Sequence, residues 1–122
     1  MRRVIFDSSF LMAVAEKPTP WMEDLTRELG GFEPLVLECA RSELTRLSEA
    51  GGKRGRLANL ALRLSDGFGA LPCGLADVDA ETVSKALEAG AVVACVDNEL
   101  SGTLRALHIV TVGLRKGRVY VP

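Results

Sequence analysis

Residues 91–98 read Ala-Val-Val-Ala-Cys-Val-Asp-Asn, the clearest buried strand in the chain, and this run ends directly in an acid. A continuous apolar run of this length is typical of a strand covered on both faces, as in a parallel sheet. Val4-Ile5-Phe6, followed by Asp7, has the same arrangement near the start of the chain. Because open α/β sheets bind ligands outside the carboxyl ends of their strands, we expect Asp7 and Asp97 to share one functional edge.

Strands and helices are predicted to alternate along the rest of the chain. The predicted strands lie at 4–6, 35–37, 91–96 and 109–112, with a short strand near 70–71 and an edge strand at 118–121. Helices are predicted between them, near 10–15, 20–29, 40–47, 57–64, 79–90 and 99–106. This alternation predicts an α/β three-layer sandwich with a central, mostly parallel sheet of four to five strands and helices on both faces.

The composition predicts one domain that spans residues 1–122. The 122 residues are 48% hydrophobic and have a mean hydropathy of +0.17, which is enough apolar material for a core. No apolar stretch approaches the roughly 18 residues that span a bilayer, and the run after Met1-Arg2-Arg3 is too short for a signal-peptide core. We therefore expect a soluble, cytoplasmic protein with no membrane partner.

The three cysteines are expected to be structural. Cys39, Cys73 and Cys95 are scattered, show no CxxC spacing and have apolar neighbours. Buried free thiols are therefore expected rather than a metal site or a disulfide.

Two further acids are expected at the same edge as Asp7 and Asp97. Glu43 lies in a helix whose apolar stripe runs through residues 40–47, and at about 100° per residue it lies about 60° from the centre of that stripe. Asp79 is expected at the N-cap of its helix, just after a connection that emerges from the sheet. Clustered carboxylates repel each other unless a divalent cation neutralises them, so the four acids predict a Mg²⁺ or Mn²⁺ site that handles phosphodiesters.

Each acid also has a simpler interpretation. Asp7, Asp79 and Asp97 could each serve only as the N-cap of a helix, and Glu43 could be an ordinary solvated helix residue. Those separate explanations do not account for the recurrence of acids on one side of the sheet. No lysine or arginine stands immediately beside the three aspartates to offset their charge, and a shared cation explains the set with one cause.

Other chemistries that use acids or bind phosphate fit the residues less well. A haloacid-dehalogenase-type phosphatase needs a second aspartate two positions after the first, where this chain has Ser9. The paired acids of a receiver domain are not clear, and Gly51-Gly52-Lys53 lacks the glycine spacing and the Ser or Thr of a Walker loop. His108 has no partner at ligand spacing, so it is interpreted as structural and a Ser-His-Asp hydrolase is disfavoured.

Four short motifs follow one another along the chain. They are Val-Ile-Phe-Asp-Ser-Ser at 4–9, Glu43-Leu44, Asp79 with the helix-ending Gly90, and Cys-Val-Asp-Asn-Glu-Leu at 95–100. In this order and at these separations they resemble the motifs of the PIN-domain nucleases, and the resemblance covers nearly the whole chain. The resemblance implies a PIN-like fold.

Two residues depart from the family pattern. Ser9 replaces a frequent asparagine and Cys95 a frequent threonine, both of which help in the family to orient the acids or a metal-bound water. Serine still forms hydrogen bonds, whereas cysteine does so poorly, so reduced activity is expected. Asp77, close to Asp79, and Asn98 are candidate auxiliary groups.

The resemblance implies a metal-dependent endoribonuclease that cleaves single-stranded or structured RNA. It assigns one or two Mg²⁺ or Mn²⁺ ions to Asp7, Asp79 and Asp97, with Glu43 completing the ligand shell or orienting the attacking water. Two basic clusters are candidate surfaces for the RNA backbone, with ordinary solvated surface as the alternative. These clusters are Lys53, Arg54 and Arg56, and Arg115, Lys116 and Arg118.

Within the family, the segment 51–56 with the Ala/Leu-rich helix after it, and the ending 118–121, resemble the ribosomal-RNA-processing branch of archaea and eukaryotes. This branch implies a ribosome-assembly partner. The runner-up is the VapC-type toxin branch, which implies a small antitoxin partner over the acidic cleft. A third alternative is a catalytically weak PIN-like module that binds RNA or protein as a scaffold. Family analogy suggests a homodimer, although no exposed apolar stripe indicates one.

Overall fold

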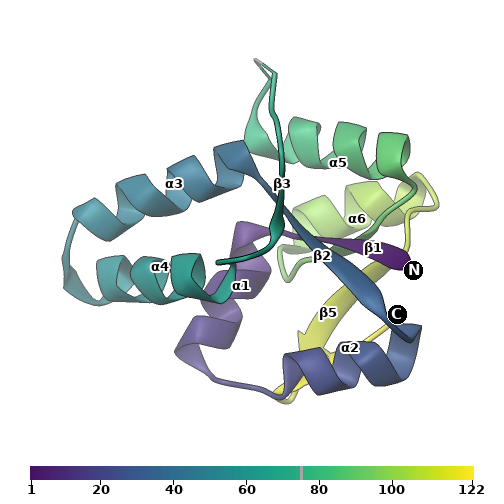
Figure 1. Ribbon diagram of the computed structural model, residues 1–122, viewed down its shortest axis with the longest axis horizontal. Helices are drawn as coiled ribbons and strands as arrows, with labels where there is room; N and C mark the ends of the chain where they lie inside the picture. Colours follow the sequence, from purple (N-terminus) through teal and green to yellow (C-terminus); the bar gives the residue numbers. More distant parts are fainter. Residues whose placement is uncertain (75) are drawn as a thin grey trace.

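The computed structural model describes residues 1–74 and 76–122, in which strands and helices alternate (Figure 1). The strands are β1 (Arg2–Phe6), β2 (Phe32–Leu37), β3 (Gly69–Leu71), β4 (Val92–Ala94), β5 (Thr111–Arg115) and β6 (Arg118–Tyr120). The helices are α1 (Ser8–Glu16), α2 (Trp21–Leu29), α3 (Glu38–Glu49), α4 (Gly52–Leu64), α5 (Val78–Ala89) and α6 (Asn98–Ala106). None of these helices has the length and apolar character needed to cross a membrane.

The strands form one sheet in the order β3-β2-β1-β4-β5-β6, parallel throughout except for the antiparallel pair β5–β6. The predicted α/β class is confirmed, but the prediction of four to five strands was too low, because the described part of the chain forms a sheet of six. β3 and β6 have only three residues each. β4 is equally short, and both edge strands were expected, near 70–71 and 118–121; their pairing with β2 and β5 completes the sheet.

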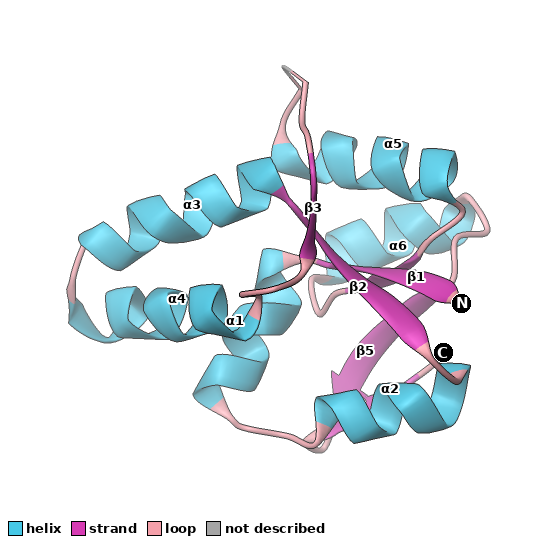
Figure 2. Ribbon diagram, in the orientation of Figure 1, coloured by secondary structure: helices cyan, strands magenta, loops and turns pink. Residues whose placement is uncertain are grey.

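The direction of the chain reverses between β1 and β4. From β1 the chain moves outward to β2 and β3, then returns to pair β4 with β1 before it continues to β5. Right-handed crossovers in opposite directions place their helices on opposite faces of the sheet. Accordingly α1, α3 and α4 pack together, whereas α5 contacts β1 and α6 contacts β5 (Figure 2). Such a reversal is the position at which open parallel sheets form a ligand crevice.

An aromatic cluster around Phe6 anchors the end of β1. The fully buried Phe6 ring lies 5.6 Å from Phe10 of α1, 5.3 Å from Trp21 of α2 and 5.0 Å from Phe68 just before β3, measured between ring centroids. Tilted and edge-to-face pairs at these separations are favourable. Because Phe6 is the last residue of β1, this cluster fixes the strand end that presents Asp7.

A disulfide joins Cys39, in the first turn of α3, to Cys73, two residues after β3, with 6.0 Å between their Cα atoms. The prediction of free thiols was therefore wrong for this pair, whereas Cys95 is a buried free cysteine. The two paired cysteines are 34 residues apart in sequence and become neighbours through the parallel pairing of β2 with β3. The bond ties the start of α3 to the loop that leads into α5.

A buried carboxylate ties α2 to β6. Asp24 accepts hydrogen bonds from Arg27 at 2.6 Å, from Arg118 at 2.6 and 3.0 Å, and from the backbone N–H of Val119 at 3.1 Å. These hydrogen bonds hold the pKa of Asp24 well below its usual range, and the bond from the Arg118 guanidinium has the largest effect. The single carboxylate thus links a helix near the start of the chain to the last strand.

Candidate functional site

Asp7 and Asp97 stand at the carboxyl ends of the two strands that flank the reversal. The backbone N–H of Asp7 donates to the carbonyl of Ala94 at 2.9 Å, so the pairing of β1 with β4 continues to Asp7 itself. Asp97 lies three residues after the end of β4 and caps α6. The two acids therefore emerge side by side where a parallel sheet forms its ligand crevice.

Ser9 connects these two strand ends through its hydroxyl. Asp7 is the N-cap of α1, and its Oδ2 accepts from the Ser9 backbone N–H at 3.0 Å and from the Ser9 hydroxyl. The same hydroxyl accepts from the backbone N–H of Val96 at 3.1 Å. One side chain therefore orients the Asp7 carboxylate and holds it against the segment that leads to Asp97.

The predicted capping role of Asp79 was wrong, because Asp77 caps α5. Asp77 has extended backbone geometry, and its Oδ1 accepts from the Ala80 N–H at 2.9 Å. Asp79 is the second residue of the helix and is exposed. The spacing Asp-x-Asp offers two possible caps, and the extended conformation at residue 77 selects the first. Asp79 thereby keeps its carboxylate free of a capping bond.

Glu43 joins the acids from the side of α3 that faces α1. Its carboxylate is half-buried, and the Ser8 hydroxyl, in the first turn of α1, donates to its Oε1 at 3.5 Å. Glu49, near the end of the same helix, is exposed. Glu43 therefore lies beside the helix start that carries Asp7.

Repulsion between these carboxylates contributes to raised pKa values at Asp7 and Asp79. Burial is the main cause that raises the pKa of Asp7, and repulsion from Asp97 adds to it, while hydrogen bonds from Ser9 oppose the shift. The pKa of Asp79 is raised first by partial desolvation and then by repulsion from four carboxylates. These four are Asp7, Asp97, Asp77 and Glu43. Acids from four separate segments therefore share one local field of like charge.

These acids form an acidic edge of the sheet rather than a complete metal-binding site. Within residues 1–74 and 76–122, no three His, Cys, Asp or Glu side chains are gathered closely enough to hold a metal ion. The caps at Asp97 and Asp77 each occupy one carboxylate oxygen, Oδ1. Carboxylates are the ligands that Mg²⁺ and Mn²⁺ prefer, and Mg²⁺ usually keeps several waters and takes only one or two carboxylates directly. The donor chemistry therefore fits such an ion.

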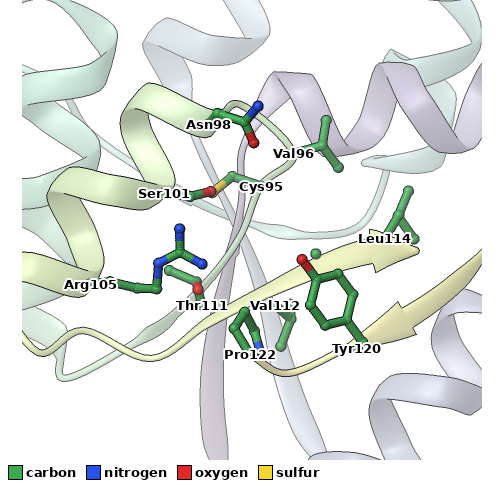
Figure 3. Close-up of a pocket in the computed structure, with 11 residues that line it drawn as sticks. Cys95, Val96, Asn98, Ser101, Arg105, Thr111, Val112, Leu114, Tyr120 and Pro122 are labelled. Atoms are coloured by element: carbon green, nitrogen blue, oxygen red, sulfur yellow. The ribbon is translucent and has the colours of Figure 1, made fainter.

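Two cavities lie next to the acidic edge. One has a volume of about 160 Å³ and lies between α5 and α6, with Asp79 and Glu99 among its lining residues. The other, of about 130 Å³, is lined by Asn98, Cys95 and residues of β5 and β6 (Figure 3). Neither cavity is lined by Asp7 or Glu43.

Cys95, which replaces a threonine of the family pattern, points towards α6. Its Sγ lies 3.0 Å from the Ser101 hydroxyl, and Figure 3 shows the two side chains end to end. Burial raises the pKa of the Cys95 thiol above its ordinary value. A neutral thiol engaged with Ser101 offers little help in orienting a water or a carboxylate.

The two basic clusters lie in different parts of the molecule. The first cluster lies at the start of α4, beside the turn between α3 and α4 on the left of Figure 1. This position is away from the start of α5. Its residues are exposed: Lys53, Arg54 and Arg56. In the second, Lys116 lines a cavity together with Val96, at the carboxyl edge. Arg115 stacks over the Tyr120 ring at 4.3 Å, and Arg118 is bonded to Asp24.

The sequence interpretation overlooked two charged residues. Glu81 is a buried acid in α5 whose Oε1 accepts from the Gly74 N–H at 2.9 Å, which holds the loop before α5. Arg105 lies in α6 and lines the cavity of Figure 3. Charged residues on helices are ordinarily solvated, so nothing in their local sequence distinguishes these two from their neighbours.

Together, the sheet order, the reversal between β1 and β4 and the acids beside it define an α/β protein with an acidic edge. The sequence profile of a PIN-like domain matches residues 4–117, and the chain belongs to that family. The predicted resemblance to PIN domains is thereby confirmed.

Two solved structures share the fold. The structure of the PIN domain endonuclease Utp24 has a TM-score of 0.81 at 24% identity, over 98% of this chain and 90% of that chain. A domain of a functionally unknown protein from Methanocaldococcus jannaschii DSM 2661 has a TM-score of 0.68 at 17% identity, over 100% of this chain and 97% of that chain. At these identities the likeness establishes the fold alone. No curated protein matches the sequence.

Proposed function

We propose that this protein is a metal-dependent endoribonuclease that uses its acidic edge to cleave RNA phosphodiesters. The observation that carries this proposal is the convergence of acids at the reversal of the sheet: Asp97 repels the Asp7 carboxylate, and Asp7, Asp97, Asp77 and Glu43 repel the Asp79 carboxylate. Bare carboxylates in such a cluster disfavour the folded state and repel a phosphate, and a divalent cation reverses both effects. Membership of the PIN-like family and the likeness to an endonuclease support the same activity.

In this proposal Asp7, Asp79 and Asp97 bind Mg²⁺ or Mn²⁺, and Glu43 completes the ligand shell or orients the attacking water. The cation, when bound, activates water and shields the charge that grows on the phosphate. Ser9 keeps the Asp7 carboxylate in one orientation through its bonds to Oδ2.

Asp77 and Asn98 have auxiliary roles in the proposed reaction. Both lie at helix starts beside the acidic edge, Asp77 as the cap of α5 and Asn98 as the first residue of α6. Asn98 can contact a water or a phosphate oxygen through its amide.

The basic residues contact the RNA backbone in this account, with different contributions. Lys116 follows the carboxyl end of β5 and lines a cavity with Val96, where it can neutralise a backbone phosphate. Lys53, Arg54, Arg56 and Arg115 lie on exposed surface. Arg118 is already bonded to Asp24 and contributes less charge to a ligand.

We place the activity in ribosomal-RNA processing, since segments 51–56 and 118–121 resemble that branch of the family. A ribosome-assembly partner and a homodimer belong to the same proposal.

A second candidate is a PIN-like module that binds RNA without cleaving it. Three observations favour it. Within residues 1–74 and 76–122, no three metal-ligating side chains are gathered closely enough to hold an ion. Asp97 is engaged in a capping bond, and Cys95 stands in place of threonine. Such a module would bind RNA in the absence of divalent metal and leave it intact.

Cleavage of a structured RNA in the presence of Mn²⁺ separates the two candidates. We expect cleavage by the wild-type protein and its loss in Asp7→Asn and Asp97→Asn. Glu49→Gln is the matched control, because Glu49 is exposed near the end of α3, and it should cleave like the wild type. Metal-independent RNA binding without cleavage would overturn the nuclease proposal and support the binding module.

A further inference from the structure

A polar cavity lies beside the acidic edge, between α6 and the β5–β6 hairpin (Figure 3). Its volume is about 130 Å³. A single water needs only about 10–15 Å³ by the same measure, so the cavity has room for several waters or for one tetrahedral oxyanion. Asn98, the immediate neighbour of Asp97, forms part of its lining. A ligand held at the acids can therefore reach into this cavity without leaving the surface.

The lining side chains suit an anion. Figure 3 shows the Arg105 guanidinium and the Tyr120 hydroxyl extending into the space from opposite sides, while Ser101 and Thr111 contribute hydroxyl groups. No aspartate or glutamate lines the cavity. Within residues 1–74 and 76–122, Arg105 forms no ion pair. A permanently charged, planar donor without an internal partner is well suited to bind a phosphate.

The position of the Tyr120 hydroxyl is fixed by its neighbours. Gly113 faces Tyr120 across the β5–β6 pair, and a Cβ at Gly113 would lie 3.3 Å from Tyr120 Cε1. The glycine thus lets the ring lie flat across β5. Arg115 covers the ring at 4.3 Å from its centroid. These contacts hold the ring in one place, so its hydroxyl is positioned before any ligand arrives.

We propose that this cavity is an oxyanion subsite that takes a backbone phosphate of the RNA, adjacent to the phosphate at the acidic edge. Arg105 supplies the positive charge, and the hydroxyls of Tyr120, Ser101 and Thr111 supply hydrogen bonds. The assignment to RNA rests on the proposed function, whereas the affinity of the cavity for phosphate does not. The subsite gives the strand a fixed register across the acids.

The first test is a titration of the metal-free, ¹⁵N-labelled protein with sodium phosphate, compared with sodium chloride at equal ionic strength. Phosphate should shift the amide resonances of Ser101, Thr111 and Tyr120. Arg105→Gln should lose these shifts, and Arg63→Gln should keep them, because Arg63 is an exposed arginine at the end of α4. An unperturbed wild-type spectrum, or equal shifts in Arg105→Gln, would overturn the subsite.

The second test measures binding of a short single-stranded oligouridylate to the Asp7→Asn protein, which should not cleave it. Adding Arg105→Gln should weaken binding about tenfold and lower the salt slope by about 0.7, as expected for one lost phosphate contact. Adding Tyr120→Phe should weaken binding less, and Arg63→Gln should leave it unchanged. Equal affinity with and without Arg105→Gln, alongside the phosphate shifts, would identify a free-phosphate site and refute the RNA assignment.

The two tests also separate the subsite from the nuclease proposal. Phosphate shifts that depend on Arg105, in a wild-type protein that cleaves no RNA, would preserve the subsite and refute the nuclease. RNA cleavage by a wild-type protein that shows no phosphate shifts would preserve the nuclease proposal and refute the subsite.

Discussion

At the residue scale, the geometry of the acidic edge depends on Ser9. Its hydroxyl donates to Asp7 and accepts from the Val96 N–H, so it spans the ends of β1 and β4. The frequent asparagine at this position in the family can also donate and accept. In this chain the serine hydroxyl makes both contacts.

Ser9→Ala should destabilise the protein by about 1–3 kcal/mol, because the Val96 N–H then loses its acceptor and Asp7 loses a donor. Ser8→Ala is the matched control, since the Ser8 hydroxyl makes only a 3.5 Å bond to Glu43. Urea denaturation of both variants gives the comparison. An equal loss in the two would show that the bridge contributes nothing specific.

The sequence was sufficient to predict the positions of Asp7 and Asp97, since each follows a continuous apolar run. It predicted Asp79 as the cap of α5, which is wrong because both Asp77 and Asp79 lie at plausible capping positions and only the folded backbone selects Asp77. The burial of Glu81 was not predictable either. It depends on the Gly74 N–H, which only the folded loop brings within 2.9 Å.

At the scale of elements, two long-range ties hold the layers around the site. The Cys39–Cys73 disulfide joins α3 to the loop before α5, and Asp24 joins α2 to β6. Neither tie follows from local sequence, because each pairs residues 34 or more positions apart.

Reduction of the disulfide should lower the free energy of unfolding by about 3–4 kcal/mol, the loop-entropy value for a closed loop of 34 residues. Chemical denaturation with and without dithiothreitol measures this difference. Cys73→Ser should be insensitive to the reductant, whereas Cys95→Ser should respond like the wild type. A wild-type protein whose free energy of unfolding is unchanged by the reductant would contradict the pairing.

Asp24 should make stability depend on acid pH. Because its folded pKa is depressed, its contribution is complete above the unfolded pKa of about 3.9 and is lost as pH falls through the lower folded pKa. Asp24→Asn should therefore lower the melting temperature by several degrees at pH 7 and flatten its decline below pH 4. Asp66→Asn, at an exposed acid, should do neither. Parallel melting curves for Asp24→Asn and wild type across this range would contradict the account.

At the scale of the whole molecule, the sheet order determines where the acids meet. The reversal between β1 and β4 brings Asp7 and Asp97 together, and α3 and the start of α5 bring Glu43 and Asp79 to the same edge. The alternation of strands and helices predicted the class of this fold. The alternation does not predict how the carboxylates of Asp77 and Asp97 are used. Each caps a helix, and its capping bond competes with any ligand for the same carboxylate.

The central claim is that these carboxylates bind divalent cation together, and the most direct test is the melting temperature during a Mn²⁺ titration. The wild-type melting temperature should rise and saturate, since an ion at 100 times its Kd stabilises the native state by about 2.7 kcal/mol. Asp7→Asn should start no lower, because burial disfavours the ionised carboxylate and asparagine still caps α1, and it should not respond to Mn²⁺. A wild-type protein indifferent to Mn²⁺, or an Asp7→Asn variant that responds as the wild type does, would contradict the claim.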